Sequence, residues 1–365
     1  MPNDNNKSEK LLWIEILRII ASFAVIIIHV VSNSYNPYTN TWLWNVANIY
    51  SMSSRWAVPV FLMITGSLML DPKRNLSIKD IFNKYLIKYL KIYCIWSFIY
   101  VVWLYIIFKG INNNFIFTID YKAMILLFLN GYAHLGYFHY FIAFIIMLPI
   151  LINIVKLSNR IIFEYFLFLW FIFTSFLPIT LNILQITTMS NWLLFNEINL
   201  IGGLIGYFFL GYYFLKYDLN KLTRICIYIL GISATVFSII ITKVISVKND
   251  NLFTLFHSYK VFTIALTASA LFIFFKYELT HILINLHDKI KKFLFIIGEC
   301  TFGIYLIHNI LIDIANYIGM KRIIASHPIR YIFICTFIIF ITSLFLVYIY
   351  KVIYNKIKTK INIIK

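Results

Sequence analysis

The sequence predicts an all-α polytopic membrane protein, a helical bundle of about ten transmembrane helices with both termini in the cytoplasm. Hydrophobic residues make up 61% of the chain and charged residues 13%, and the mean hydropathy is +0.84. A soluble domain is about half apolar and about a quarter charged. Because no stretch is polar enough for a separate soluble domain, we expect one membrane domain over residues 11–353, with a polar N-terminal tail (1–10) and a basic C-terminal tail (354–365).

Ten apolar segments have the length that crosses a bilayer, for which ~20 residues suffice. The first lacks a small-residue cleavage site and is too long for a signal-peptide core, so we expect it to remain in the mature protein. The second and the sixth are short and need flanking residues. The expected spans are 11–31, 56–70, 86–108, 134–154, 161–181, 200–215, 225–242, 258–275, 293–313 and 331–350.

The distribution of charge predicts the orientation. The net charge is +18, and with the N-terminus inside, cytoplasmic segments hold 22 Lys and Arg against 7 in external loops. This is the asymmetry of the positive-inside rule, and loop 32–54 carries no charged residue at all. The basicity therefore indicates a protein in a lipid bilayer and argues against nucleic acid as a partner. Basic inner loops also suit an anionic cytosolic ligand.

The first span contains two residues that a bilayer tolerates poorly, Arg18 and His29. Eleven helical steps separate them, which is about three turns plus 20°, so both lie on one face ~16 Å apart along the axis. A guanidinium at membrane depth is costly unless it faces a partner or a polar cavity. A histidine is suited to proton transfer near neutral pH. The pair therefore predicts a site that does chemistry.

The expected topology places the other unusual residues in two layers. Arg18 and Glu299 lie toward the cytoplasm. The outer layer contains His29, Arg55, His134, Glu197, Lys260 and His308. This arrangement suits transfer from an anionic cytosolic donor held near Arg18 to an external acceptor, with His29 as general base and Arg55 or a backbone donor stabilising the oxyanion.

Several motifs in order along the chain resemble the acyltransferase-3 family of multi-pass membrane acyltransferases. They are LRIIASFAVIIIH (17–29), WNVANIYSMSSR (44–55), SSRWAVPVFLMITGSLML (53–70), HLGYFHYFIAFIIMLPIL (134–151), SYKVFTIALTASALFIF (258–274) and TFGIYLIHNIL (301–311). They recur in the family's order and extend over most of the chain, from residue 17 to residue 311. The likeness is to surface-polysaccharide O-acetyltransferases, such as the enterobacterial-common-antigen type, in a stand-alone form.

The resemblance implies a bacterial plasma-membrane enzyme that takes an acyl group, acetyl above all, from cytosolic acyl-CoA. It implies a hydroxyl of a cell-surface glycan or of its lipid-linked precursor as acceptor, with no bound cofactor. By motif match His29 is catalytic and Arg18 meets the donor, while Arg55, His134 and His308 match recurring family positions. The family usually has Trp at the position of Gly136, so Tyr137 or Phe138 is expected to line that side of the site. This difference leaves open which acceptor fits.

Simpler interpretations stay open. Arg18 can form a structural ion pair with Glu15 or Glu299, and His29 can make an interhelical hydrogen bond. An exporter or flippase of polysaccharide or lipid-linked sugar also carries buried polar residues, and a ligand-sensing membrane module is a third class. An acyl-histidine intermediate is an alternative to direct transfer. The histidines lack the spacing of a metal site, and the oligomeric state does not follow from the sequence.

Overall fold

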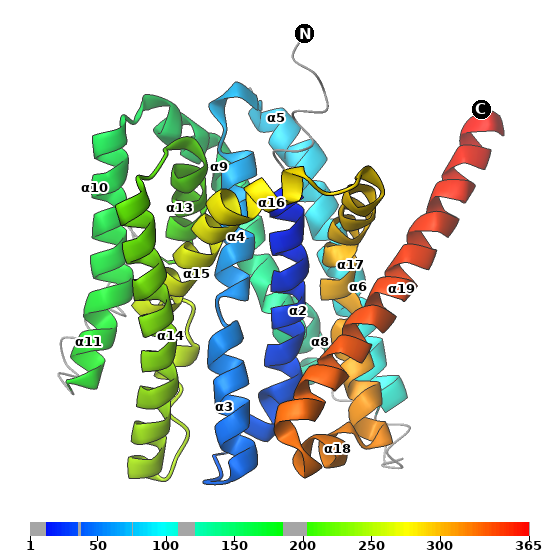
Figure 1. Ribbon diagram of the computed structural model, residues 1–365. Helices are drawn as coiled ribbons and strands as arrows, with labels where there is room; N and C mark the ends of the chain where they lie inside the picture. The colour runs from blue at the N-terminus through cyan, green and yellow to red at the C-terminus, as the bar shows by residue number, and fades with distance from the viewer. Residues whose placement is uncertain (1–11, 36–37, 75, 109–120, 185–202, 365) are drawn as a thin grey trace. The chain divides into compact units, whose positions relative to one another are not determined.

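All regular structure in the described part of the chain is helical. The computed structural model describes residues 12–35, 38–74, 76–108, 121–184 and 203–364 (Figure 1). No strand occurs in these ranges. Together with the apolar helices below, this confirms the all-α membrane class predicted from composition.

Eight segments of the described residues are long and apolar enough to cross a membrane: Leu12–Ser32, Ile78–Tyr105, Gly136–Leu157, Arg160–Ile183, Lys221–Asn249, Leu255–Leu283, Asp288–Ile318 and Pro328–Thr359. Each overlaps one predicted span. The short second and sixth predictions fall on α4 (Ala57–Met69) and α13 (Ile205–Lys216), of 13 and 12 residues. Because helices of that length rise only about 20 Å, these two need neighbouring segments to cross.

The chain packs as two compact units, one of Met1–Ser67 with Tyr165–Lys365 and the other of Leu68–Glu164. That both units act as one membrane domain stays a prediction. The larger unit contains α2 (Leu12–Tyr35), α3 (Trp42–Ser54), α4, η5 (Phe171–Phe176), α11 (Leu177–Ile183), α13, α14 (Lys221–Asn249), η7 (Leu255–His257), α15 (Phe262–Phe274), η8 (Phe275–Leu279), α16 (Thr280–Ile284), α17 (Asp288–Ile318), α18 (Met320–Ser326) and α19 (Pro328–Ile364). The smaller contains η1 (Pro72–Arg74), α5 (Ile78–Asp80), η2 (Ile81–Leu86), α6 (Ile87–Val102), η3 (Trp103–Phe108), α8 (Tyr121–Asn130), η4 (Ala133–Leu135) and α9 (Gly136–Leu157), and α10 (Arg160–Trp170) joins the two.

Helix α2 packs most extensively against α17, α3 and α19 of the larger unit (Figure 1). Its Leu17, Ala21 and Val31 are fully buried. The hydrophobic cluster around it includes Trp44 of α3, Ile304 of α17 and further residues of α18 and α19. Burial of such side chains positions α2 firmly between its neighbours, so its polar residues are held at defined places.

Helix α3 differs from the sequence-based prediction of an external loop over residues 32–54. The helix begins after Thr41, whose hydroxyl accepts a hydrogen bond from the Trp44 amide at 3.2 Å. Such N-caps satisfy one of the free amides of a first turn. Trp44 and Ala47 are then fully buried. The uncharged residues 42–54 therefore form a helix that packs into the larger unit.

Close approach of α4 to α13 depends on two glycines. A Cβ at Gly66 would collide with the backbone of Phe208, and a Cβ at Gly211 would collide with the backbone of Met63. The contact is reciprocal, with each helix supplying one glycine to the backbone of the other. Small residues at such crossings are typical of membrane helices. The two short predicted spans, α4 and α13, therefore pack directly against each other.

Candidate active site

Helix α2 carries Arg18 and His29. The helix is continuous from Leu12 to Tyr35, so helical periodicity places both side chains on one face about 16 Å apart. Both are partly exposed, whereas Leu17 and Val30 beside them in the sequence are buried. The helix therefore packs its apolar residues and keeps its two polar groups accessible.

His29 lies against a second histidine, His308 of α17. The centroids of the two rings are 5.1 Å apart and the rings are tilted by 52°. His308 is fully buried, while His29 is partly exposed. A partly accessible imidazole backed by a buried one is an arrangement in which the first can meet a substrate and the second can orient it.

Backbone carbonyls determine the tautomer of His308. Its Nδ1 lies 2.8 Å from the carbonyl oxygen of Tyr305 and 3.2 Å from that of Ile304. Carbonyl oxygens only accept hydrogen bonds, so Nδ1 carries a proton and donates it. In the neutral ring Nε2 is then the acceptor. His308 therefore offers a lone pair on its other edge, which suits an N–H donor nearby.

Arg55 lies at the joint between α3 and α4, where it is the C-cap of α3. Its Nη1 donates to the carbonyl oxygen of His257 at 3.0 Å, and its Nη2 donates to Oγ of Ser51 at 3.2 Å. Its positive charge interacts electrostatically with the rings of His29 and His257. The guanidinium is therefore held by α3 and by the segment before α15, and it contributes positive charge to the surroundings of His29.

Arg18 forms an ion pair with Glu15, one turn earlier on α2, with Nη1 2.6 Å from Oε1. Glu15 itself packs against Gly298 of α17, where any side chain would overlap its carboxylate. Glu299 pairs instead with Lys351 of α19, at 2.8 Å. Arg18 therefore pairs with Glu15, whereas Glu299 pairs with Lys351. Gly298 leaves space for the Glu15 carboxylate.

The other candidate residues belong to other segments of the chain, and one of them lies outside the described residues. Lys260 is half-buried in the turn before α15. Glu197 lies outside the described residues. His134 and Tyr137 belong to the smaller unit. There His134 is buried with its ring 4.9 Å from that of Tyr100, and Tyr137 stacks on Phe141 with centroids 6.2 Å apart.

The structure adds three residues that the sequence did not indicate: Ser51, His257 and Gly298. Ser51 and the His257 carbonyl hold Arg55. A serine four residues before an arginine on a helix is a signal that could have been used, because such residues share a face. His257 acts through its backbone oxygen and Gly298 acts by having no side chain. Neither effect can be inferred from the residue type.

The larger unit thus defines a membrane protein whose polar residues meet on α2, α3 and α17, with a histidine pair toward one end and an Arg–Glu pair toward the other. The family model described as an acyltransferase domain matches residues 11–348. The chain therefore belongs to the acyltransferase-3 family and is a membrane acyltransferase. Searches of curated proteins and of solved structures find no match.

Proposed function

We propose that the protein is an O-acyltransferase of the bacterial cell membrane that moves an acyl group, most simply acetyl, from cytosolic acyl-CoA to a hydroxyl of a cell-surface glycan or its lipid-linked precursor. The observation that carries the proposal is the placement of Arg18 and His29 on one face of α2, with His29 against His308. A cation and a supported base are thus separated by a length that an extended donor can bridge.

On the donor side, Arg18 attracts the anionic part of CoA from the cytoplasm, where the basic loops raise its local concentration. Ser22 lies between Arg18 and His29 on the same face by helical spacing. Its hydroxyl is buried and has no hydrogen-bond partner within the described residues. Because this hydroxyl is covered in the structure, a donor arm with amide groups would supply that partner only once the neighbouring helices part to admit it. The stripe from Arg18 through Ser22 to His29 therefore matches a long, polar, anionic donor.

At the reacting end, His29 takes the proton of the acceptor hydroxyl as the oxygen attacks the thioester carbonyl carbon. The C–O bond forms, the C–S bond breaks, and the CoA thiolate leaves with the proton returned by His29. Positive charge from Arg55 stabilises the oxyanion that develops on the carbonyl oxygen. The proposed transfer thus proceeds with acyl-CoA and the acceptor hydroxyl as its two reactants.

His308 is proposed as the positioning residue of His29. Its Nδ1–H is committed to the Tyr305 and Ile304 carbonyls, so its Nε2 is an acceptor, and we propose that an N–H of the neighbouring His29 ring turns to it in the reacting complex. That contact selects the tautomer of His29 and leaves the opposite nitrogen with its lone pair toward the acceptor. Orientation by a second polar group is how bases in many hydrolytic sites are prepared.

The test is CoA release and acceptor acylation by purified full-length protein in lipid nanodiscs with acetyl-CoA. His29→Ala should lower kcat by about 10²–10⁴, while the matched variant His281→Ala, at an exposed histidine of α16, should leave it unchanged. Direct transfer gives intersecting double-reciprocal plots, whereas an acyl-histidine intermediate gives parallel plots and an acylated peptide by mass spectrometry.

A wild-type protein that moves a glycan across vesicles without acyl transfer, and a His29→Ala variant that does the same, would establish the exporter alternative. The acceptor is identified by comparing the acyl masses of surface glycans in a deletion strain and in a strain carrying His29→Ala. Loss of the same acyl mass in both strains is the expected result.

A further inference from the structure

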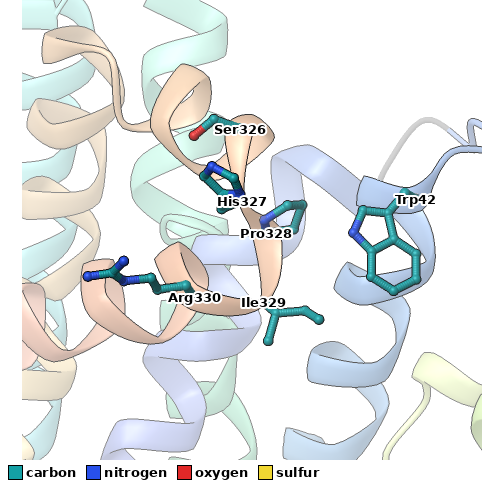
Figure 2. A pocket seen from close by; sticks show the side chains of 6 residues that line it. All are labelled: Trp42, Ser326, His327, Pro328, Ile329 and Arg330. Carbon is teal, nitrogen blue, oxygen red and sulfur yellow. The ribbon is translucent and has the colours of Figure 1, made fainter.

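An open hollow of about 320 Å³ lies between the first residue of α3 and the joint of α18 with α19. It is lined by Trp42, Ser326, His327, Pro328, Ile329 and Arg330 (Figure 2). Its volume is at the lower end of the range for small-molecule sites, about 300–1,000 Å³. The Tyr50 hydroxyl donates to the Ile329 carbonyl at 2.8 Å, and Pro328 is buried, so the floor of the hollow is held by both α3 and α19.

The hollow lies at the same end of the larger unit as the histidine pair. Helix α2 continues six residues beyond His29 before α3 begins, and α17 continues ten residues beyond His308 before α18 begins. These segments rise about 9 Å and about 15 Å. A ligand in the hollow therefore lies beyond His29 on the side away from Arg18, which is the acceptor side of the proposed reaction.

The hollow has an aromatic side, formed by Trp42, and a basic side, formed by His327 and Arg330. Figure 2 shows the Trp42 ring on one side of Pro328 and the side chains of His327 and Arg330 on the other. Trp42 is 64% exposed, whereas Trp44, two residues later, is fully buried. An indole offers a flat apolar surface for the C–H face of a sugar ring. A guanidinium binds carboxylate or phosphate with paired hydrogen bonds.

We propose that this hollow is an anchoring subsite for an anionic saccharide, in which a sugar ring stacks on Trp42 and a carboxylate or phosphate of the same chain pairs with Arg330. The proposal rests on the proposed function in one respect, since it makes the bound saccharide the acceptor. The anchored unit is held in the hollow and a later unit of the chain reaches His29. Acceptors with acidic groups are thereby preferred over neutral ones of the same length.

The test measures binding to full-length protein in nanodiscs of neutral phosphatidylcholine, by isothermal titration calorimetry. The probes are hyaluronan tetrasaccharide, which carries carboxylates, N-acetylglucosamine 1-phosphate, which carries a phosphate, and neutral tetra-N-acetylchitotetraose, called chitotetraose below. At least one anionic probe should bind more tightly than chitotetraose and weaken as salt is raised. Which of the two binds identifies the anionic group.

Arg330→Ala should weaken the anionic probe about tenfold, as expected for loss of one charge-assisted pair, and should leave chitotetraose unchanged. Trp42→Ala should weaken both kinds of probe, and Trp42→Phe should restore part of the loss. The matched controls are Arg322→Ala and Tyr317→Ala, which remove another exposed cation and another exposed ring at the same end. Thermal unfolding of each variant verifies that it is folded.

Equal binding of all three probes, or equal losses in Arg330→Ala and Arg322→Ala, would overturn the subsite. A Trp42→Ala variant that binds as the wild type does would reduce Trp42 to an interfacial anchor and overturn it as well. Failure of the proposed function is separate, because binding of the probes persists in a protein that transfers no acyl group. Conversely, an acylating enzyme whose acceptor KM is unchanged in Arg330→Ala retains its function and loses the subsite.

Discussion

Replacement of Gly298 by alanine tests whether the contact between α2 and α17 positions the Arg18–Glu15 pair. The new methyl group would overlap Oε2 of Glu15 and lie 3.0 Å from its Cβ. Overpacking of this kind costs about 1–3 kcal/mol, against a gain of up to about 1 kcal/mol from replacing glycine by alanine in a helix. We therefore expect a net destabilisation of up to about 2 kcal/mol and a Glu15 carboxylate displaced from Arg18.

The matched control is Gly136→Ala, because no atom lies within 4 Å of a Cβ built there. This variant should be neutral or slightly stabilising, so the two substitutions should differ by about 1–3 kcal/mol. Unfolding in detergent against urea or heat gives the free energies. Glu15→Ala combined with Gly298→Ala should recover part of the loss, a coupling that a double-mutant cycle measures. Equal stability of the two glycine variants, with no coupling to Glu15, would refute the packing argument.

Three further predictions concern the site and its surroundings. His308→Ala should lower kcat by up to about 100-fold because it misplaces His29, with little change in the KM for acyl-CoA and a displaced pH–rate profile; an unchanged profile would limit His308 to packing. Arg55→Lys should lose the paired contacts to Ser51 and His257 and lower kcat without weakening acceptor binding. The Lys276 hydrogen bond holds the pKa of Asp218 below its ordinary value, so its contribution, below about 1 kcal/mol for such an exposed pair, is present above pH ~4 and disappears as the pH falls through the lowered pKa. Asp218→Asn should remove that part of the acid dependence of unfolding.

Much of the fold follows from the sequence because a bilayer imposes strong rules. Backbone groups in hydrocarbon must be satisfied within their own segment, so apolar stretches of sufficient length become helices. This is why the eight long helices of the described residues all coincide with predicted spans. Helix α3 was missed because its apolar face packs against α2 and α14, contacts that local composition does not reveal.

For the candidate site, the sequence alone determined that Arg18 and His29 share a face, because helical periodicity is a local property of one chain segment. It also indicated the family, through motifs between residues 17 and 311, and the family model that matches residues 11–348 confirms this prediction. Only the tertiary structure decided that His308 is the ring beside His29 and that Glu15, over Gly298, is the partner of Arg18 while Glu299 pairs with Lys351. These choices depend on how helices are rotated and packed against one another, and packing depends on the shapes of distant residues, which no single segment contains.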